Sequence, residues 1–191
     1  MPQSLSAVYI HLVFSTKHRQ PFLRDRSLRT DLHSFLGGTS KTLECPPLIV
    51  GGIEDHVHLL ARFGRTITQA EWVKELKRVS NIWLKEEAGL AGFEWQAGYA
   101  DFSVSQSNLK QVERYIANQE QHHRKLSFQD EVRALLTKHD IKWAEGRNRV
   151  AVSRRRLFVS PPPQPPSGVR PSVRKSRPEP GPYPRHRSRW T

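Results

Sequence analysis

The sequence holds one cysteine, Cys45, among its 191 residues. A single cysteine excludes an internal disulfide, and it favours a reducing compartment. No apolar run approaches the roughly 18 to 20 residues that are needed to span a bilayer. The first apolar run follows MPQSLS, a flank without a cationic residue, so we expect neither a secretory signal nor a membrane anchor.

Acidic residues are scarce in the last 45 residues, where proline is abundant. Residues 147–191 contain one Asp or Glu against 12 Lys and Arg, together with 10 of the 14 prolines. Residues 1–146 are nearly balanced, with 17 acidic and 19 basic side chains. The last segment has too little apolar surface to offset its ordering entropy. We therefore expect one domain over 1–146 and a disordered Pro/Arg-rich basic tail over 147–191.

The net charge of +13 predicts an anionic partner. Nucleic acid is the commonest such partner, although a basic tail can equally lie on a membrane surface or simply aid solubility. The expectation from composition is a cytoplasmic, nucleoid-associated protein.

The periodic segments of residues 1–146 predict a small α+β domain. Alternating apolar residues predict strands over 7–15, 48–53 and 56–63, and a less regular one over 93–105. Apolar residues at helical spacing predict a helix that begins at residue 25 and ends at Gly37 and Gly38. The same spacing predicts three more helices, over 69–87, 109–124 and 128–139. The order β, α, β, β, α, β, α fits a ferredoxin-like antiparallel sheet with helices on one face.

Two histidines stand one residue apart in the stretch EDHVHLLA. Successive side chains of a strand point to opposite faces, so His56 and His58 point the same way. At that spacing the two imidazoles can share one metal ion. Taken alone, however, the spacing favours two hydrogen-bonded histidines of the core.

A second group of polar residues lies about sixty residues further on. Tyr115 and Gln119 are four apart and share a face of the predicted helix 109–124, with His122 and His123 one turn later. A tyrosine hydroxyl can attack a phosphodiester, and an amide oxygen is a neutral metal ligand. Two imidazoles and one amide suit Mg²⁺ or Mn²⁺. Tyr99 is the rival nucleophile, but no ligand follows it in its strand-like run.

Four strings occur in an order that resembles one enzyme family. They are HLVFSTKHR at 11–19, DHVHLL at 55–60, WQAGYADFSVS at 95–105 and YIANQEQHH at 115–123. Together they resemble the single-tyrosine HUH transposases, the insertion-sequence (IS200-like) and REP-associated enzymes, over roughly residues 5–140. The basic tail lies outside this resemblance.

The resemblance implies a metal-dependent transposase that cleaves and rejoins single-stranded DNA at hairpin element ends through a 5′-phosphotyrosine. His56, His58 and Gln119 would hold Mg²⁺ or Mn²⁺, and Tyr115 would be the nucleophile. Members of the family are dimers in which the tyrosine helix can serve the partner's histidine pair. The lack of a GxxxxGK[ST] loop fits strand transfer without ATP. Another HUH single-strand endonuclease and a catalytically inactive nucleic-acid-binding domain remain the alternatives.

Basic side chains are the candidates for phosphate contacts, although charged helix faces are more often only solvated. These DNA-binding candidates are Arg62, Arg65, Lys74, Lys77, Arg78, Lys85, His122 and His123. For Asp55 the interpretation is a turn residue rather than a partner of a histidine ring. His11 is interpreted as structural.

Overall fold

The computed structural model describes residues 5–142, so the predicted tail over 147–191 lies outside the described residues. The strands are β1 (Tyr9–Ser15), β2 (Pro47–Gly52), β3 (His56–Arg62) and β4 (Ala100–Val104). The helices are α1 (Arg26–Thr42), α2 (Gln69–Glu86), α3 (Leu109–Ala117), α4 (Gln119–His122) and α5 (Phe128–Lys138), with short 3₁₀ turns η1 (Lys17–Arg19) and η2 (Gln106–Asn108). In this part of the chain no helix is both long and apolar enough to cross a membrane.

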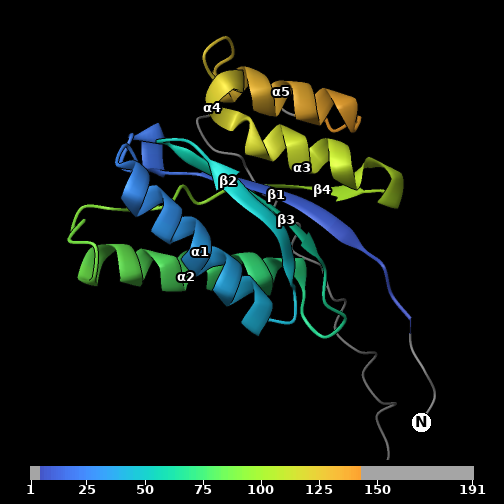
Figure 1. The fold of residues 1–191 in the computed structure, drawn as a ribbon, viewed down its shortest axis with the longest axis horizontal. Coiled ribbons are helices and arrows are strands. Elements are labelled where there is room, and N and C mark those ends of the chain that lie inside the picture. Colours follow the sequence, from blue (N-terminus) through green and yellow to red (C-terminus); the bar gives the residue numbers. More distant parts are fainter. Residues whose placement is uncertain (1–4, 143–191) are drawn as a thin grey trace, which may run out of the picture. The chain divides into compact units, whose positions relative to one another are not determined.

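The four strands form one antiparallel sheet in the order β2-β3-β1-β4 (Figure 1). This is the strand order of the ferredoxin-like arrangement, so the predicted α+β class is confirmed. β1 and β3 occupy the centre, and their register places Val13 opposite His58 and Ser15 opposite His56. The histidine pair therefore starts a central strand.

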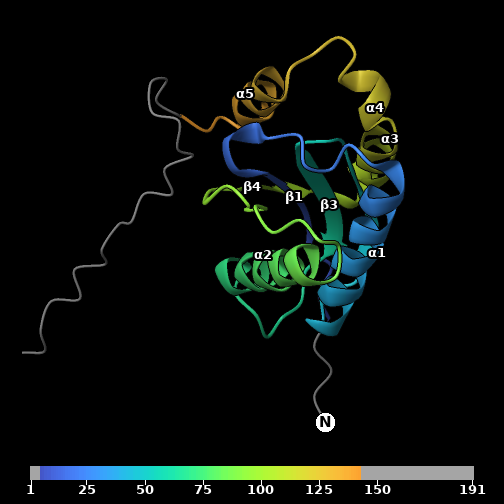
Figure 2. The same cartoon turned by 90° about the vertical axis from the view of Figure 1, so that its left-hand side faces the viewer.

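Helices cover both faces of the sheet, whereas the sequence predicted helices on one face. α1 and α2 pack on one face and α3, α4 and α5 lie over the other (Figures 1 and 2). The reason is that β3 is buried on both sides. Val57 and Leu59 enter the core beneath α1 and α2, while Leu60 packs against Leu109 and Ile116 of α3.

Two predicted boundaries were wrong. α1 does not close at Gly37 and Gly38 but continues to Thr42, because its buried stripe runs on from Leu36 to Ser40. The burial of this last turn offsets the cost of about 1 kcal/mol that each glycine imposes on a helix. The predicted strand over 93–105 is regular only in β4, and a single bridge from Trp95 to Thr16 precedes it.

Gly51 of β2 lets α3 approach the sheet closely. A Cβ atom there would lie 2.7 Å from Cγ2 and 2.8 Å from the carbonyl oxygen of Ile116. We expect Gly51→Ala to lower the free energy of unfolding by about 1–3 kcal/mol, because the backbone of α3 must move away. Denaturant titration measures this loss. Gly38→Ala, with no atom within 4 Å of the new methyl group, is the control and should be neutral or stabilising; equal losses in both variants would contradict the account.

Candidate active site

β3 directs His56 and His58 to the face of the sheet that α3 to α5 cover, and both side chains are fully buried. His56 Nδ1 lies 2.7 Å from Asp55 Oδ1, and His58 Nδ1 lies 2.9 Å from Nε2 of the buried His11. Asp55 thus orients a histidine, contrary to the sequence interpretation. A neutral imidazole carries one N–H, so a His56 that donates from Nδ1 presents a lone pair at Nε2. A His58 that donates from Nδ1 to His11 likewise presents a lone pair at Nε2.

Gln119 brings an oxygen to these nitrogens. Its Nε2 donates to Glu131 Oε1 at 3.0 Å, which leaves its Oε1 facing His56 Nε2 at 3.3 Å. The buried Nε2 of His58 has no hydrogen-bond partner. In the tautomer with the hydrogen on Nδ1, lone pairs face one another here, and such lone pairs can bind a cation. The donor set of two imidazoles and one amide oxygen therefore fits a divalent metal.

The predicted helix over 109–124 is broken between the residues that it was expected to align. α3 ends at Ala117, Asn118 leaves helical geometry with φ −100° and ψ 20°, and α4 begins at Gln119. The Asn118 side chain bonds back to the carbonyl of Arg114 at 2.9 Å, a local bond that competes with the helix. Tyr115 of α3 and Gln119 of α4 still both reach the histidine pair of β3 and Glu131 of α5. These side chains together form one cluster.

The Tyr115 hydroxyl donates to Glu131 Oε1. The Tyr115 ring stands edge-on to His58, with centroids 5.9 Å apart. The rival Tyr99 packs with the core beneath α1 and α2, and Lys77 lies over its ring. Only Tyr115 of these two tyrosines shares the face of the histidine pair.

Glu131 of α5 is the site residue that the sequence interpretation missed. Its carboxylate is 1% exposed and contacts Tyr115, Gln119 and His123. A signal was present, because Glu131 lies three residues after Phe128 and four before Leu135, within the apolar stripe of its helix. A carboxylate in such a stripe is seldom buried without a partner.

The protonation states of the cluster follow from burial and from the charge of Glu131. Burial favours a raised pKa for Glu131, but the hydrogen bond from His123 and the nearby His58 ring outweigh it and hold the pKa well below its usual range. Burial lowers the pKa of His58 to about 4, so this imidazole is neutral at pH 7. Burial and then the Glu131 charge raise the pKa of Tyr115, so its phenol is protonated in this arrangement. The cluster therefore combines a buried carboxylate with a neutral His58 and a protonated Tyr115.

The family model described as "Transposase IS200 like" matches residues 4–119, more than half of the chain. The chain belongs to the IS200-like transposase family. A Deinococcus radiodurans R1 protein described as a transposase is 23% identical, with 62% of this chain and 98% of that chain covered and a TM-score of 0.48. A REP-associated tyrosine transposase solved with a REP hairpin is 11% identical, with 64% and 72% covered and a TM-score of 0.49. A comparison of this chain with curated proteins found no match.

The structure places His122 and His123 of the transposase at the cluster. His123 Nε2 lies 3.1 Å from Glu131 Oε2, and its Nδ1 lies 2.8 Å from the Leu126 carbonyl oxygen. The His122 ring stands against Tyr115, with centroids 5.1 Å apart. A DNA contact by either histidine stays a prediction, but the His123 side chain is only 6% exposed.

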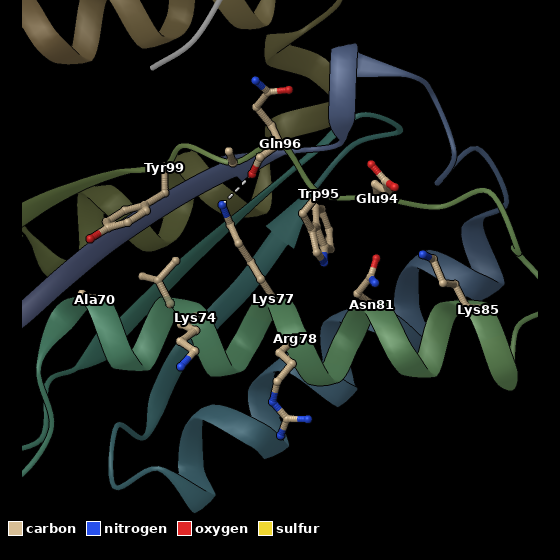
Figure 3. A pocket seen from close by; sticks show the side chains of 12 residues that line it. Ala70, Lys74, Lys77, Arg78, Asn81, Lys85, Glu94, Trp95, Gln96 and Tyr99 are labelled. Atoms are coloured by element: carbon tan, nitrogen blue, oxygen red, sulfur yellow. Dashed lines mark hydrogen bonds between the residues drawn. The ribbon is translucent and has the colours of Figure 1, made fainter. Parts of the chain in front are cut away.

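The predicted basic residues of the transposase are not brought to this cluster. Arg62 ends β3 at the opposite end from His56, and it lines a pocket that Arg65 also lines. Helix α2 lies on the opposite face of the sheet from helices α3, α4 and α5 (Figures 1 and 2). Its four predicted DNA contacts line a pocket of about 490 Å³ against the segment 94–99 (Figure 3): Lys74, Lys77, Arg78 and Lys85.

Lys77 is engaged within the fold. Its Nζ donates to the carbonyl oxygen of Gln96 at 2.9 Å (Figure 3) and to that of Gly98 at 2.7 Å, and burial lowers its pKa to about 8. We expect Lys77→Met to lower the free energy of unfolding by about 1–3 kcal/mol, because two partly buried carbonyls lose their donor. The exposed Lys74→Met is the matched control, with a change within about 0.5 kcal/mol by urea titration. Similar values for the two variants would show that Lys77 does not hold this segment.

Proposed function

We propose that this transposase cleaves and rejoins single-stranded DNA at hairpin element ends, with Tyr115 as the nucleophile. The observation that carries the proposal is the convergence of one phenol, two imidazole lone pairs and one amide oxygen in a single cluster. A phosphodiester needs a positioned nucleophile and positive charge near its oxygens. Tyr115 would be the nucleophile in the cluster, and the nitrogen and oxygen donors can hold a cation that supplies the positive charge. A protein with this activity would meet its DNA in the cytoplasm, at the nucleoid.

The metal would be Mg²⁺ or Mn²⁺, held by His56, His58 and Gln119. Nitrogen and oxygen donors without a thiolate suit both ions, and the two imidazoles favour Mn²⁺. When bound, the ion would supply Lewis-acid polarisation of the scissile phosphate. Asp55 and His11 hold the two imidazoles in the required orientation through their Nδ1 atoms.

Tyr115 would attack the phosphorus, so that a bond forms between its oxygen and the phosphorus while the bond to the 3′ oxygen breaks. The phenol loses its proton, the 3′ oxygen leaves as a 3′-OH, and the 5′ phosphate stays on Tyr115. The phosphotyrosine remains a phosphodiester. A 3′-OH from a second strand can therefore displace Tyr115 in the reverse reaction, which joins the strands without ATP.

The partners proposed for the chain are a single-stranded DNA hairpin and a second copy of the chain. Tyr115 lies beside His58 of its own β3. The basic residues of α2 would contact a hairpin only where DNA extends around the sheet edge to the other face.

The test is a joining assay with labelled single-stranded oligonucleotides that carry the hairpins flanking the coding region of this chain. With Mn²⁺ or Mg²⁺ present, we expect a product that contains two element ends in one strand. Cleavage and a covalent adduct without any joined product would support the single-strand endonuclease instead. Binding without cleavage would support the inactive binding domain.

A further inference from the structure

Glu131 occupies the centre of the cluster, and the proposed function gives it no role. Its Oε1 accepts hydrogen bonds from Tyr115 and Gln119, while its Oε2 faces imidazoles. Oε2 lies 3.1 Å from His123 Nε2, 3.5 Å from His58 Nε2 and 3.6 Å from His56 Nε2. The Glu131 carboxylate is 1% exposed, so its charge is buried against three imidazoles.

The separations of the donor atoms match those of neighbouring ligands on one ion. With bonds of about 2.1 Å, adjacent ligands stand about 3.0 Å apart in an octahedron and about 3.4 Å apart in a tetrahedron. The distances from Glu131 Oε2 to the three imidazoles run from 3.1 to 3.6 Å, and Gln119 Oε1 lies 3.3 Å from His56 Nε2. One donor atom each from His56, His58, His123 and Glu131 lies within 4.8 Å of the others.

We propose that Glu131 is a further ligand of the metal site through Oε2, and that the same carboxylate positions Tyr115 through Oε1. This inference rests on the proposed function, and it adds α5 to the site. The sheet and α4 supply imidazole and amide donors, and α5 supplies the carboxylate. The carboxylate then links the metal to the nucleophile, so that binding of the ion fixes Tyr115 in its place beside His58.

The phosphate oxygens of the substrate would complete the coordination. A ligand set with one carboxylate holds Mg²⁺ and Mn²⁺ more tightly than imidazoles and an amide alone, because these cations prefer charged oxygen. His123 Nε2 lies 3.1 Å from Oε2. It therefore either joins the ligand set or holds the carboxylate in place.

Metal binding without DNA tests this inference separately from catalysis. Free Mn²⁺ is counted by electron paramagnetic resonance during titration of the full chain. We expect Glu131→Gln to weaken Mn²⁺ binding about 10- to 100-fold. Glu131→Asp, which keeps the charge, should bind more tightly than Glu131→Gln. Asp130→Asn removes a carboxylate from the exposed position before it and should bind like the wild type.

A purely structural role would be revealed by thermal unfolding. For a ligand, the rise in melting temperature that Mn²⁺ causes is lost in Glu131→Gln. For a structural residue, the variant melts lower without metal but keeps the full rise. Wild-type affinity in Glu131→Gln, with binding lost in His56→Ala, would overturn this inference and leave the proposed metal site standing. Absence of Mn²⁺ binding to the wild type would overturn both.

Discussion

Tyr115→Phe should abolish the covalent protein–DNA adduct, with a loss of about 10³-fold or more in its rate of formation. The change removes one oxygen atom, which is the proposed nucleophile, and keeps the ring that packs beside His58 and His122. The free energy of unfolding should change by no more than about 1–2 kcal/mol, because one hydrogen bond to Glu131 is lost. The adduct is measured as a denaturant-resistant band with a labelled single-stranded hairpin and Mn²⁺.

Tyr99→Phe is the matched control for this result. Tyr99 also lies in a partly buried aromatic environment, but it packs with the core on the α2 side of the sheet. Its variant should form the adduct at the wild-type rate. An adduct of normal yield in Tyr115→Phe, or its loss in Tyr99→Phe, would assign the chemistry to a different group.

His58→Ala should remove both metal binding and cleavage. The variant lacks the imidazole of His58, whose buried Nε2 has no hydrogen-bond partner. A loss of metal binding or cleavage therefore cannot be explained by a broken hydrogen bond at Nε2. We expect cleavage to fall about 10²-fold or more, by analogy with the loss of other electrostatic groups at active sites. EDTA should inactivate the wild type to a similar extent. Added Mn²⁺ should restore the wild type and leave His58→Ala inactive.

The exposed His139, at the end of α5, provides the control for this second result. His139→Ala should keep both its affinity for Mn²⁺ and its rate of cleavage. Retention of metal-dependent cleavage by His58→Ala would mean that the ion binds elsewhere. Cleavage by the wild type in the presence of EDTA would mean that the chemistry needs no ion.

Much of the fold was predictable, because periodicity reports which face of a segment is buried. The strands at His11 and His58 and the α2 helix follow from alternation and from the stripe of Trp72 and Leu76. Helix coverage of the second face was missed, since the apolar residues on both sides of β3 were not interpreted as two cores. The extension of α1 past Gly37 depends on tertiary packing, which overrides local propensity.

The candidate site was predictable only where its residues carry a pattern. His56 and His58 share a strand face and Tyr115 precedes Gln119 by four, so spacing aligned each pair, and the resemblance to the transposases gave the pairs their roles. Glu131 comes from a separate helix, and no local rule places α5 over the histidine pair. The position of an isolated charge inside an apolar stripe was the only available signal.

The central claim is that Tyr115 becomes joined to the 5′ phosphate of a cleaved single strand. The most direct measurement is to trap the adduct on a hairpin oligonucleotide, digest the protein and the DNA, and identify the modified peptide by mass spectrometry. The account predicts a phosphonucleotide on the oxygen of Tyr115 and a free 3′-OH on the released strand. Attachment at Tyr99 or any other residue, or a 3′-phosphoryl linkage, would contradict it.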